Sequence, residues 1–363
     1  MNKKLITMKI RHKILVLSLS LVFIPLIIAG FLAFRVGVHA LNQVIGRSLQ
    51  KTATYIMDSM DRDLYERTAA LRSWAGLAVM QDVLKGDPDG KIASYLSEIS
   101  KNNAALYRDL FCVNAKGVVI ASANKYRTGM NVSKEAWFQK GVMEGVPYIG
   151  PVHALDNAQE NLIGIVQPIH NASDHSSVIG IVVSILEWES FSGAAKLINE
   201  GKEGELRDGY LSVVDDTGSV LFQFTSAGGA VRKSLPADTQ SLQKVMLGGA
   251  GFLMESGKDG KTCLSGFAHS SGYKDGKKLD WSAILSVPRT TAFAPVYYLG
   301  KQLGVVGILC LILIPAIVII FSKGITRPIT HMVDILKDLA GGEGDLTRSI
   351  EVQTDDEIKE LAD

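Results

Sequence analysis

The chain has 363 residues, of which 47% are hydrophobic and 21% charged, and its formal net charge is +1. A charge this close to balance lacks the basic surplus of nucleic-acid-binding proteins, so no nucleic-acid partner is expected. Three cysteines, none of them in a CxxC pair, exclude a full disulfide framework, a cysteine zinc site and a covalently attached c-type haem. The mean hydropathy of +0.18 is high for this charge content, which indicates that apolar residues are concentrated in segments.

The first apolar segment runs from Ile14 to Phe34. About 21 residues of helix span roughly 30 Å, the thickness of the hydrocarbon core of a bilayer. A cleaved signal peptide is the alternative, but the run is too long and no small-residue cleavage site follows it. We therefore expect a transmembrane helix over residues 14–34. The basic residues before it predict that residues 1–13 lie in the cytoplasm: Lys3, Lys4, Lys9, Arg11 and Lys13.

A second apolar segment, from Leu303 to Phe321, is followed by Lys323 and Arg327. These charges place its C-terminal end in the cytoplasm as well. A buried core helix is the alternative, but it would not need about 20 unbroken apolar residues. We expect a transmembrane helix over residues 301–322. The two crossings would enclose about 265 residues outside the cytoplasm, and a loop of that length must fold as a domain.

Hydrophobic residues recur every three or four positions from Leu41 to Trp74, which is the period of an amphipathic helix. A helix of about 45 residues is far longer than the average of about 12 in globular proteins. This segment therefore predicts a stalk against which other parts of the domain pack.

Beyond the stalk, the pattern changes to strands, and it occurs twice. A hairpin is predicted at 110–122 with Gly117 in its turn, and a second one at 211–223 with Gly218 in its turn. Both glycines are expected to supply a positive φ angle. Each hairpin is followed by helical or loop residues and by further strands, such as "LIGIVQPIH" and "VIGIVVSIL". The chain thus predicts an α+β fold of two modules, each an antiparallel sheet of about five strands backed by helices.

This order of membrane helix, long helix, two mixed modules and membrane helix resembles the double Cache sensor domain of bacterial chemoreceptors and sensor kinases. The resemblance covers residues 36–298. It implies two PAS-like modules on the long N-terminal helix, a distal one at about 85–190 and a proximal one at about 205–290, in the periplasm or outside the cell.

The segment after the second crossing carries a coiled-coil seam, in which apolar residues step by four and three: Ile325, Ile329, Met332, Leu336 and Leu339. "GGEGD" breaks this helix, and Asp355, Asp356 and Glu357 begin another, at the end of a helix dipole that favours acids. With the Arg327–Pro328 pair and "GDLT", residues 323–363 resemble a HAMP linker whose second helix is incomplete. A plain amphipathic helix is the alternative. The resemblance implies a homodimer that relays a signal to an output domain.

In double Cache receptors, the distal module usually holds the ligand. The covering segment here, "KEAWFQKGVMEGVPYIGPV", offers Trp137, Phe138 and Tyr148 as rigid walls, although packing of the module's own core is an equal interpretation. Amino-acid-binding members carry an arginine two positions before the tryptophan and an aspartate near the end of the last strand. Here Glu135 stands at the first position and Ser184 or Ile185 at the second, so the resemblance argues against amino-acid sensing. We take Ser184 as the fourth candidate ligand residue.

Other charged residues give weaker indications. Glu135 could face a cation and Arg127 or Lys134 an acid, although solvated surface side chains are the simpler interpretation. A polar loop holds His170, Asp174 and His175, which favours a hairpin tip over a metal site because no rigid element fixes their spacing. No nucleophile elbow, phosphate loop or paired carboxylates stand out. We expect no metal, no cofactor and no enzymatic activity.

The sequence therefore predicts a multi-pass protein of the bacterial cytoplasmic membrane that resembles the sensing half of a methyl-accepting chemotaxis protein. It would bind an extracytoplasmic small molecule, act as a homodimer and signal through HAMP to cytoplasmic proteins. The alternative is the sensing half of a histidine kinase or a diguanylate cyclase. Ligand identity, the sign of the response and direct or indirect sensing stay open.

Overall fold

The structure is a computed structural model of the chain. It divides into two compact units, a sheet unit of residues 42–292 and a helix unit of residues 1–41 together with 293–363. The residues that it describes are 10–151, 162–174, 176–187, 208–225, 240–256, 260–274 and 279–340.

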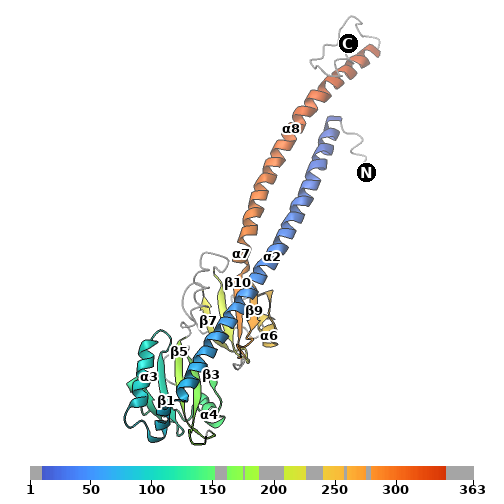
Figure 1. Cartoon of the computed structure of the whole chain (residues 1–363). Helices are drawn as coiled ribbons and strands as arrows, with labels where there is room; N and C mark the ends of the chain where they lie inside the picture. Colours follow the sequence, from blue (N-terminus) through green and yellow to red (C-terminus); the bar gives the residue numbers. More distant parts are fainter. Residues whose placement is uncertain are drawn as a thin grey trace. The chain divides into compact units, whose positions relative to one another are not determined.

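The N-terminal half of the molecule is dominated by one helix, α2 (Ile10–Ala75). It runs unbroken through both the first apolar segment and the predicted stalk (Figure 1). From Ile45 onward its apolar stripe is buried, which confirms the helical period read from the sequence. The fully or nearly fully buried side chains of this stripe are Ile45, Leu49, Ala53, Ile56, Met57, Met60, Leu64 and Leu71.

The distal module is a five-stranded antiparallel sheet in the order β2-β1-β5-β4-β3. One face is covered by α4 (Ala136–Met143), and the other by η1 (Ala78–Lys85), with α3 (Lys91–Asn102) against β1 and β2. A short 3₁₀ turn, η2 (Lys125–Arg127), follows β2. The strands are β1 (Asp109–Asn114), β2 (Val119–Ser122), β3 (Tyr148–Pro151), β4 (Leu162–His170) and β5 (Val178–Glu187).

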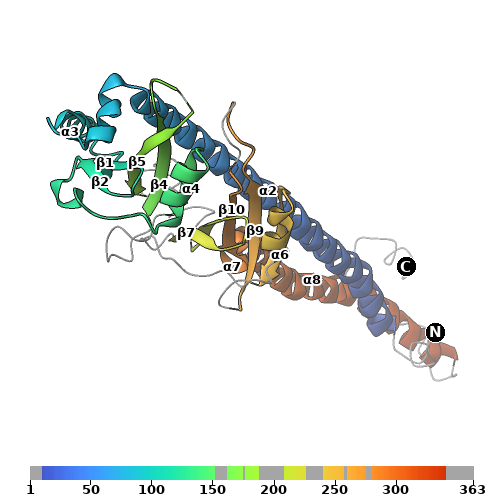
Figure 2. The same cartoon turned by 90° about the horizontal axis from the view of Figure 1, so that it is seen from below.

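The proximal module repeats this topology in the order β7-β6-β10-β9-β8, so the predicted repeat of two α+β modules is confirmed. Helix α6 (Gln240–Met246) lies beside β9 (Figure 2). Gly117 and Gly218 take positive φ angles of 83° and 80° in the matching turns, as the sequence predicts. The strands are β6 (Tyr210–Val214), β7 (Val220–Thr225), β8 (Gly251–Ser256), β9 (Thr262–His269) and β10 (Ser282–Pro288).

Helix α2 packs directly on the proximal sheet. A Cβ added to Gly266 of β9 would overlap the backbone of Leu49 and Gln50, so only glycine allows this approach. About three turns further along the helix, the carboxylate of Asp61 accepts hydrogen bonds from Ser270 Oγ at 2.8 Å and from the amide of Gly272 at 2.9 Å. The helix is thereby fixed to both the strand and the loop that follows it.

The same helix also contacts the distal module. Arg67 Nη1 donates a hydrogen bond to the carbonyl of Leu106 at 3.2 Å. The ring of Trp74 meets that of Tyr107 edge-on, with 5.7 Å between the ring centroids. One rigid element therefore contacts both modules, so a change in the packing of either module can act on it.

The proximal module leads into the second long helix. Strand β10 ends at Pro288, and α7 (Arg289–Ala292) joins it to α8 (Ala294–Ala340). Helix α8 is continuous through the second apolar segment and past Pro328, so the predicted boundary between membrane helix and linker falls inside one helix. The predicted HAMP connector and second helix lie outside the described residues.

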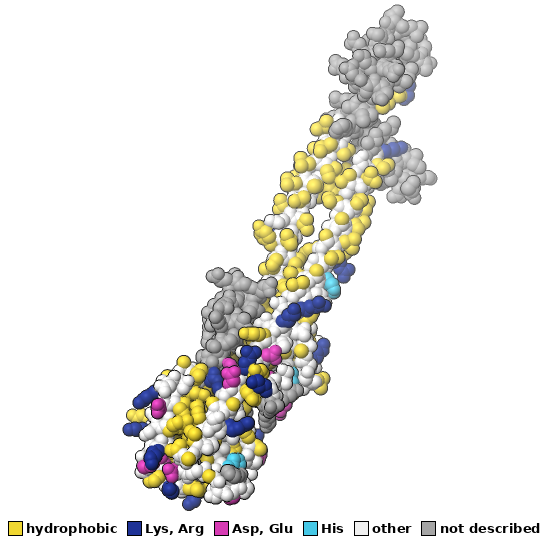
Figure 3. Space-filling model, in the orientation of Figure 1, with side chains coloured by type: hydrophobic (Ala, Val, Ile, Leu, Met, Phe, Trp, Pro, Cys, Tyr) yellow, Lys and Arg dark blue, Asp and Glu magenta, His cyan; other side chains and the backbone are white. Residues whose placement is uncertain are grey.

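The apolar stretches of α2 and α8 expose their hydrophobic side chains (Figure 3). Val16–Ala75 and Ala294–Ile320 are helices long and apolar enough to cross a membrane. Exposed apolar surface of this extent is not left in water by a soluble monomer, so these stretches call for another apolar environment.

Candidate ligand-binding site

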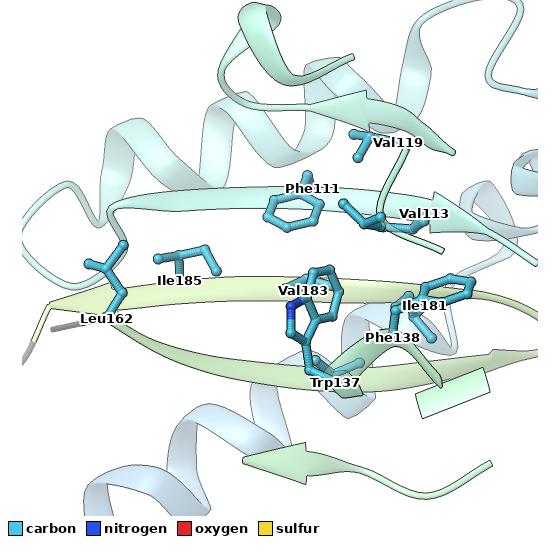
Figure 4. Close-up of a cluster of buried hydrophobic side chains, with 11 residues drawn as sticks. Phe111, Val113, Val119, Trp137, Phe138, Leu162, Ile181, Val183 and Ile185 are labelled. Carbon is cyan, nitrogen blue, oxygen red and sulfur yellow. The ribbon is translucent and has the colours of Figure 1, made fainter. Parts of the chain in front are cut away.

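The face of the distal sheet under α4 is the predicted ligand-binding face. Alternate residues of β1 and β5 point to it, because successive side chains of a strand lie on opposite faces. Phe111 of β1 lies opposite Val183 of β5, and Ile181 and Ile185 follow the same alternation. Figure 4 shows these side chains in one buried cluster with Trp137 and Phe138.

Helix α4 brings Trp137 and Phe138 onto this face, as the sequence suggested. Trp137 is 3% and Phe138 is 5% exposed. The ring of Trp137 meets that of Phe111 edge-on at 6.3 Å between centroids. Both side chains therefore pack in the core of the module, which is the packing role that the sequence allowed beside ligand contact.

The indole nitrogen of Trp137 gives this core a polar atom. Nε1 is buried and has no hydrogen-bond partner among the described residues. An indole N–H can only donate, and leaving a buried donor unpaired costs about 1–3 kcal/mol. The cluster thus holds a donor for which an acceptor would bring a gain in free energy.

A buried ion pair lies on the same face, at the start of β1. The side chain of Arg127 donates from Nε to the carboxylate of Asp109, and both side chains are almost fully buried. The guanidinium carbon of Arg127 lies 6.0 Å from the ring centroid of Phe111. Burial raises the pKa of Asp109 above its usual range, against the opposing pull of Arg127. Sequence reasoning favoured a solvated Arg127, which is wrong because the partner is 18 positions away in the chain.

Tyr148 stands at the edge of the cluster, on strand β3. Its side chain packs against the buried residues and folds back over Gly150, where a Cβ would meet the phenol oxygen. Lys140 Nζ lies 5.4 Å from its ring centroid. Burial raises the pKa of the Tyr148 hydroxyl, so this group stays a neutral donor at neutral pH.

Ser184 does not join the other three candidates. It lies opposite Leu110 and Ile165, on the face that η1 covers, whereas Ile185 shares the face of Trp137. Its hydroxyl is buried without a hydrogen-bond partner among the described residues. The alternation along β5 thus corrects the assignment of Ser184 to the same pocket as Trp137.

The anchors of an amino-acid site are not replaced by other charges on this face. Glu135 precedes α4 and makes no capping hydrogen bond through its side chain, and Lys134 is exposed. Asp109 is the carboxylate that β1 itself contributes, and it is engaged by Arg127. Of these two acids, Asp109 is committed to Arg127, and Glu135 lies before α4, outside the buried cluster.

The polar loop between β4 and β5 is a tight turn around Asp174. This carboxylate accepts hydrogen bonds from the amides of Ser176 and Ser177, at 3.0 and 3.1 Å. No group of three or more possible metal ligands occurs among the described residues, and His175 lies outside them. The interpretation as a hairpin tip fits these contacts.

Two cavities lie at the junction of the distal and proximal modules. One, of about 350 Å³, has Tyr148 and Lys140 in its wall together with Asp215 and Asp216 of the proximal module. The other, of about 420 Å³, lies along helix α2. Tyr148 therefore separates the aromatic cluster from the first of these cavities.

A comparison with protein families decides the classification. The Cache domain family matches residues 38–296. The chain belongs to the Cache domain family. The HAMP domain family matches residues 320–363, directly after the second apolar segment. The double Cache architecture and the HAMP region expected from the sequence are thereby confirmed.

The curated relatives that the chain matches include methyl-accepting chemotaxis proteins. The chain is 21% identical over 364 residues to the methyl-accepting chemotaxis protein McpA of Pseudomonas putida, a match that covers 98% of the chain and 52% of McpA. The chain spans about half the length, or less, of the curated relatives that it matches.

Solved structures show the same fold. The periplasmic sensory domain of the Campylobacter jejuni chemoreceptor Tlp1 superposes with a TM-score of 0.52 at 13% identity, over 70% of this chain and 99% of Tlp1's. The extracellular domain of the candidate histidine kinase soHK1S-Z6 gives a TM-score of 0.52 at 14% identity, over 71% of this chain and 99% of that domain. At these identities the likeness concerns the fold alone.

Proposed function

We propose that this chain is the sensing half of a transmembrane chemoreceptor that detects a small molecule outside the cytoplasm. The observation that carries the proposal is the order of its parts. A Cache domain lies between two helices long and apolar enough to cross a membrane, and a HAMP region follows the second of them. The likeness to a methyl-accepting chemotaxis protein over nearly the whole chain supports chemotaxis as the output.

The ligand site in this proposal is the α4 face of the distal module. An occupant that reaches the N–H of Trp137 would displace part of the aromatic packing against Phe111 and Val183. It would need a hydrogen-bond acceptor and an apolar or planar body, because the surrounding side chains are apolar. An α-amino acid fits poorly, since the buried acid of this face, Asp109, already pairs with Arg127.

Two covalent connections would carry the signal out of the sheet unit. Helix α2 contacts both modules and continues to Ile10, and β10 continues through α7 into α8. A ligand that binds two packings of the distal sheet on α2 unequally shifts the balance between them. That shift would bias the HAMP region between two states. A homodimer is part of the proposal, because an isolated HAMP seam has nothing to bury against.

The test is a chimera in which residue 363 is joined to the matching point of the HAMP linker of a chemoreceptor with a known output. Inner-membrane vesicles with the chimera, its coupling protein and its kinase would be titrated with organic acids, amines, amino acids and purines. We expect at least one compound to change kinase activity with a saturable concentration dependence.

The site is tested with two matched tryptophan variants. Trp137→Phe removes the N–H but keeps an aromatic ring, and we expect roughly a tenfold rise in the half-maximal concentration. Trp281→Phe, a buried tryptophan of the proximal module, should leave it unchanged. A chimera that controls the kinase but responds to no compound would contradict direct sensing. Equal effects of the two variants would contradict the distal site.

A histidine kinase or diguanylate cyclase output is the second candidate. The fold is shared equally with the extracellular domain of a candidate histidine kinase. In either case we propose that the chain itself senses and transmits, without enzymatic activity of its own. A chimera with a histidine kinase that responds to the same compounds, while the chemoreceptor chimera does not, would favour this candidate.

A further inference from the structure

The larger of the two cavities at the junction of the modules, of about 420 Å³, lies outside the distal cluster. Three separate parts of the chain form its walls. They are one face of α2, the start of β3 with the residues before it (Val146, Pro147 and Ile149), and Tyr273 and Leu279 of the proximal module. Its volume falls within the range of about 300–1,000 Å³ that is usual for small-molecule sites.

The wall from α2 is a single stripe along the helix. Its members recur at helical spacing and mix apolar with polar side chains: Asp61, Leu64, Tyr65, Thr68, Ala69 and Arg72. Residues three and four apart lie on one face of a helix, so all six can meet the same occupant. The apolar members, together with Val146, Pro147 and Leu279, form a largely hydrophobic interior.

The polar members of the stripe differ in whether they are already engaged. Asp61 accepts hydrogen bonds from Ser270 Oγ and from the amide of Gly272, and the hydroxyl of Thr68 donates to the carbonyl of Leu64 at 2.7 Å. Arg72 is exposed and has no ion-pair partner among the described residues. It is therefore the uncommitted charge in the wall of this cavity.

Two cationic side chains lie against the aromatic part of the wall. The rings of Tyr65 and Tyr273 meet edge-on at 5.5 Å between centroids. Lys274 Nζ lies 5.3 Å and the guanidinium carbon of Arg62 lies 5.7 Å from the ring centroid of Tyr273. The acid of the wall, Asp61, is buried and committed, so a cationic ligand would meet repulsion without compensation.

We propose that this cavity is a second small-molecule site, which takes an organic monocarboxylate with an aliphatic or aromatic body. The carboxylate would pair with Arg72 at the mouth, in the bidentate geometry that guanidinium and carboxylate share. The body would lie against Leu64, Tyr65 and Pro147 in place of water. Because the occupant touches α2 and both modules, it would act on their packing independently of the distal cluster.

The test uses the full chain in nanodiscs and measures binding by titration calorimetry. The probes are hexanoate, octanoate, phenylacetate and 3-phenylpropionate, each beside its primary amide, which keeps the body and removes the charge. At least one acid should bind with a saturable isotherm, and its amide roughly tenfold or more weakly.

Variants locate the site. Arg72→Gln should weaken binding of the acid roughly tenfold to a hundredfold, whereas Arg47→Gln, at an exposed position of the same helix, should have no effect. Ala69→Leu fills the cavity and should abolish binding, and Trp137→Phe in the distal cluster should leave it unchanged. Each variant is first checked for wild-type thermal unfolding, and Arg72→Gln decides alone if Ala69→Leu does not fold.

Two results would overturn the proposal. One is the absence of saturable binding for every acid of the series. The other is binding that is equal for acid and amide or that survives Arg72→Gln. Either result leaves the chemoreceptor proposal untouched, because that proposal places its ligand in the distal cluster and not in this cavity.

Discussion

The two modules of the sheet unit share one topology but differ in the side chains that they bury on the matching face. Strand register pairs Phe111 with Val183 in the distal sheet and Ser212 with Ile284 in the proximal sheet, so phenylalanine and serine hold equivalent positions. Likewise, Ile185 of the distal module corresponds to Ser286. At these two positions the distal face buries apolar side chains and the proximal face buries serines, beside a smaller apolar cluster that includes Ile284 and Phe267.

The polar side chains of the proximal face satisfy one another. Gln223 Nε2 donates to Ser212 Oγ at 3.0 Å, and the hydroxyls of Ser265 and Ser286 are 2.8 Å apart. By contrast, the buried side-chain atoms without a partner, among the described residues, include Trp137 Nε1 and Ser184 Oγ of the distal module and none of the proximal strands. The distal module thus buries polar atoms without a partner in the described part of the chain, whereas the proximal strands pair theirs, and this difference supports the proposed placement of the ligand site in the distal module.

The largest effect is expected at the buried ion pair of the distal face. Arg127→Met leaves the carboxylate of Asp109 buried without its partner, which should lower the free energy of unfolding by about 3–5 kcal/mol. Chemical denaturation of the full chain in nanodiscs measures it. Replacing both partners with apolar residues, Asp109→Leu with Arg127→Met, should recover most of the loss.

The neighbouring surface pair is the control for this prediction. Arg108 Nη1 lies 2.8 Å from Glu187 Oε1, and both side chains are partly exposed. Arg108→Met should cost at most about 1 kcal/mol. If the two arginine variants lost the same unfolding free energy, burial would not be the reason for the large effect expected at Arg127.

A second effect tests the contact of the proximal sheet with α2. Gly266→Ala places a methyl group against the backbone of Leu49 and Gln50, which should cost about 1–3 kcal/mol of unfolding free energy. Gly251→Ala in the adjacent strand meets only the end of the Phe267 ring and should cost less. If the two alanine variants unfold at the same denaturant concentration, this contact does not hold the helix.

Substitution of two fully buried serines, one in each module, compares the polar atoms of the modules directly. Ser212→Ala leaves Gln223 without one of its partners and should cost about 1 kcal/mol. Ser184→Ala removes a hydroxyl that has no partner among the described residues, so stability should stay the same or rise by up to about 1 kcal/mol. Thermal unfolding of the two variants checks the signs, and a loss of stability in Ser184→Ala would contradict the contrast.

The smallest effect concerns pH. Burial raises the pKa of Asp61 in the folded protein, against hydrogen bonds that lower it. The folded state then holds this proton more tightly than the unfolded state. Stability is therefore lost as pH rises from about 4, the unfolded value, through the folded pKa. Asp61→Asn cannot ionise and should lack this loss. In urea unfolding between pH 4 and 7, the free energy of unfolding of the wild type should fall relative to that of the variant. A difference between the two that is the same at every pH would contradict the raised pKa of Asp61.

Local patterns were enough to predict much of this fold. The run "LIGIVQPIH" matches β4 residue for residue, the turn glycines adopt the expected positive φ, and the apolar stripe of α2 is buried as its period predicts. These features depend on neighbours in sequence, such as alternation, turn chemistry and helical spacing. The continuity of α8 was not predicted, because the sequence was divided into a membrane helix over residues 301–322 and a linker from residue 323 onward.

The site was less accessible to sequence reasoning. The pairing of Arg127 with Asp109 and the cavity beside Arg72 depend on side chains from separate elements, which no local pattern relates. The face of Ser184 could have been found, since alternation from Val183 places Ile185, not Ser184, beside it. Arg127 was expected to be solvated because it is charged. In the structure it is buried, because Asp109 neutralises its charge there.

Hydrogen exchange of the full chain in nanodiscs tests the central claim most directly. It would be measured by mass spectrometry, with and without the compound that acts most strongly on the chemoreceptor chimera. We expect slower exchange in α4, β1 and β5 and unchanged exchange in β6, β9 and β10, because binding protects the elements that form the site. Protection confined to the proximal strands would contradict the assignment of sensing to the distal module.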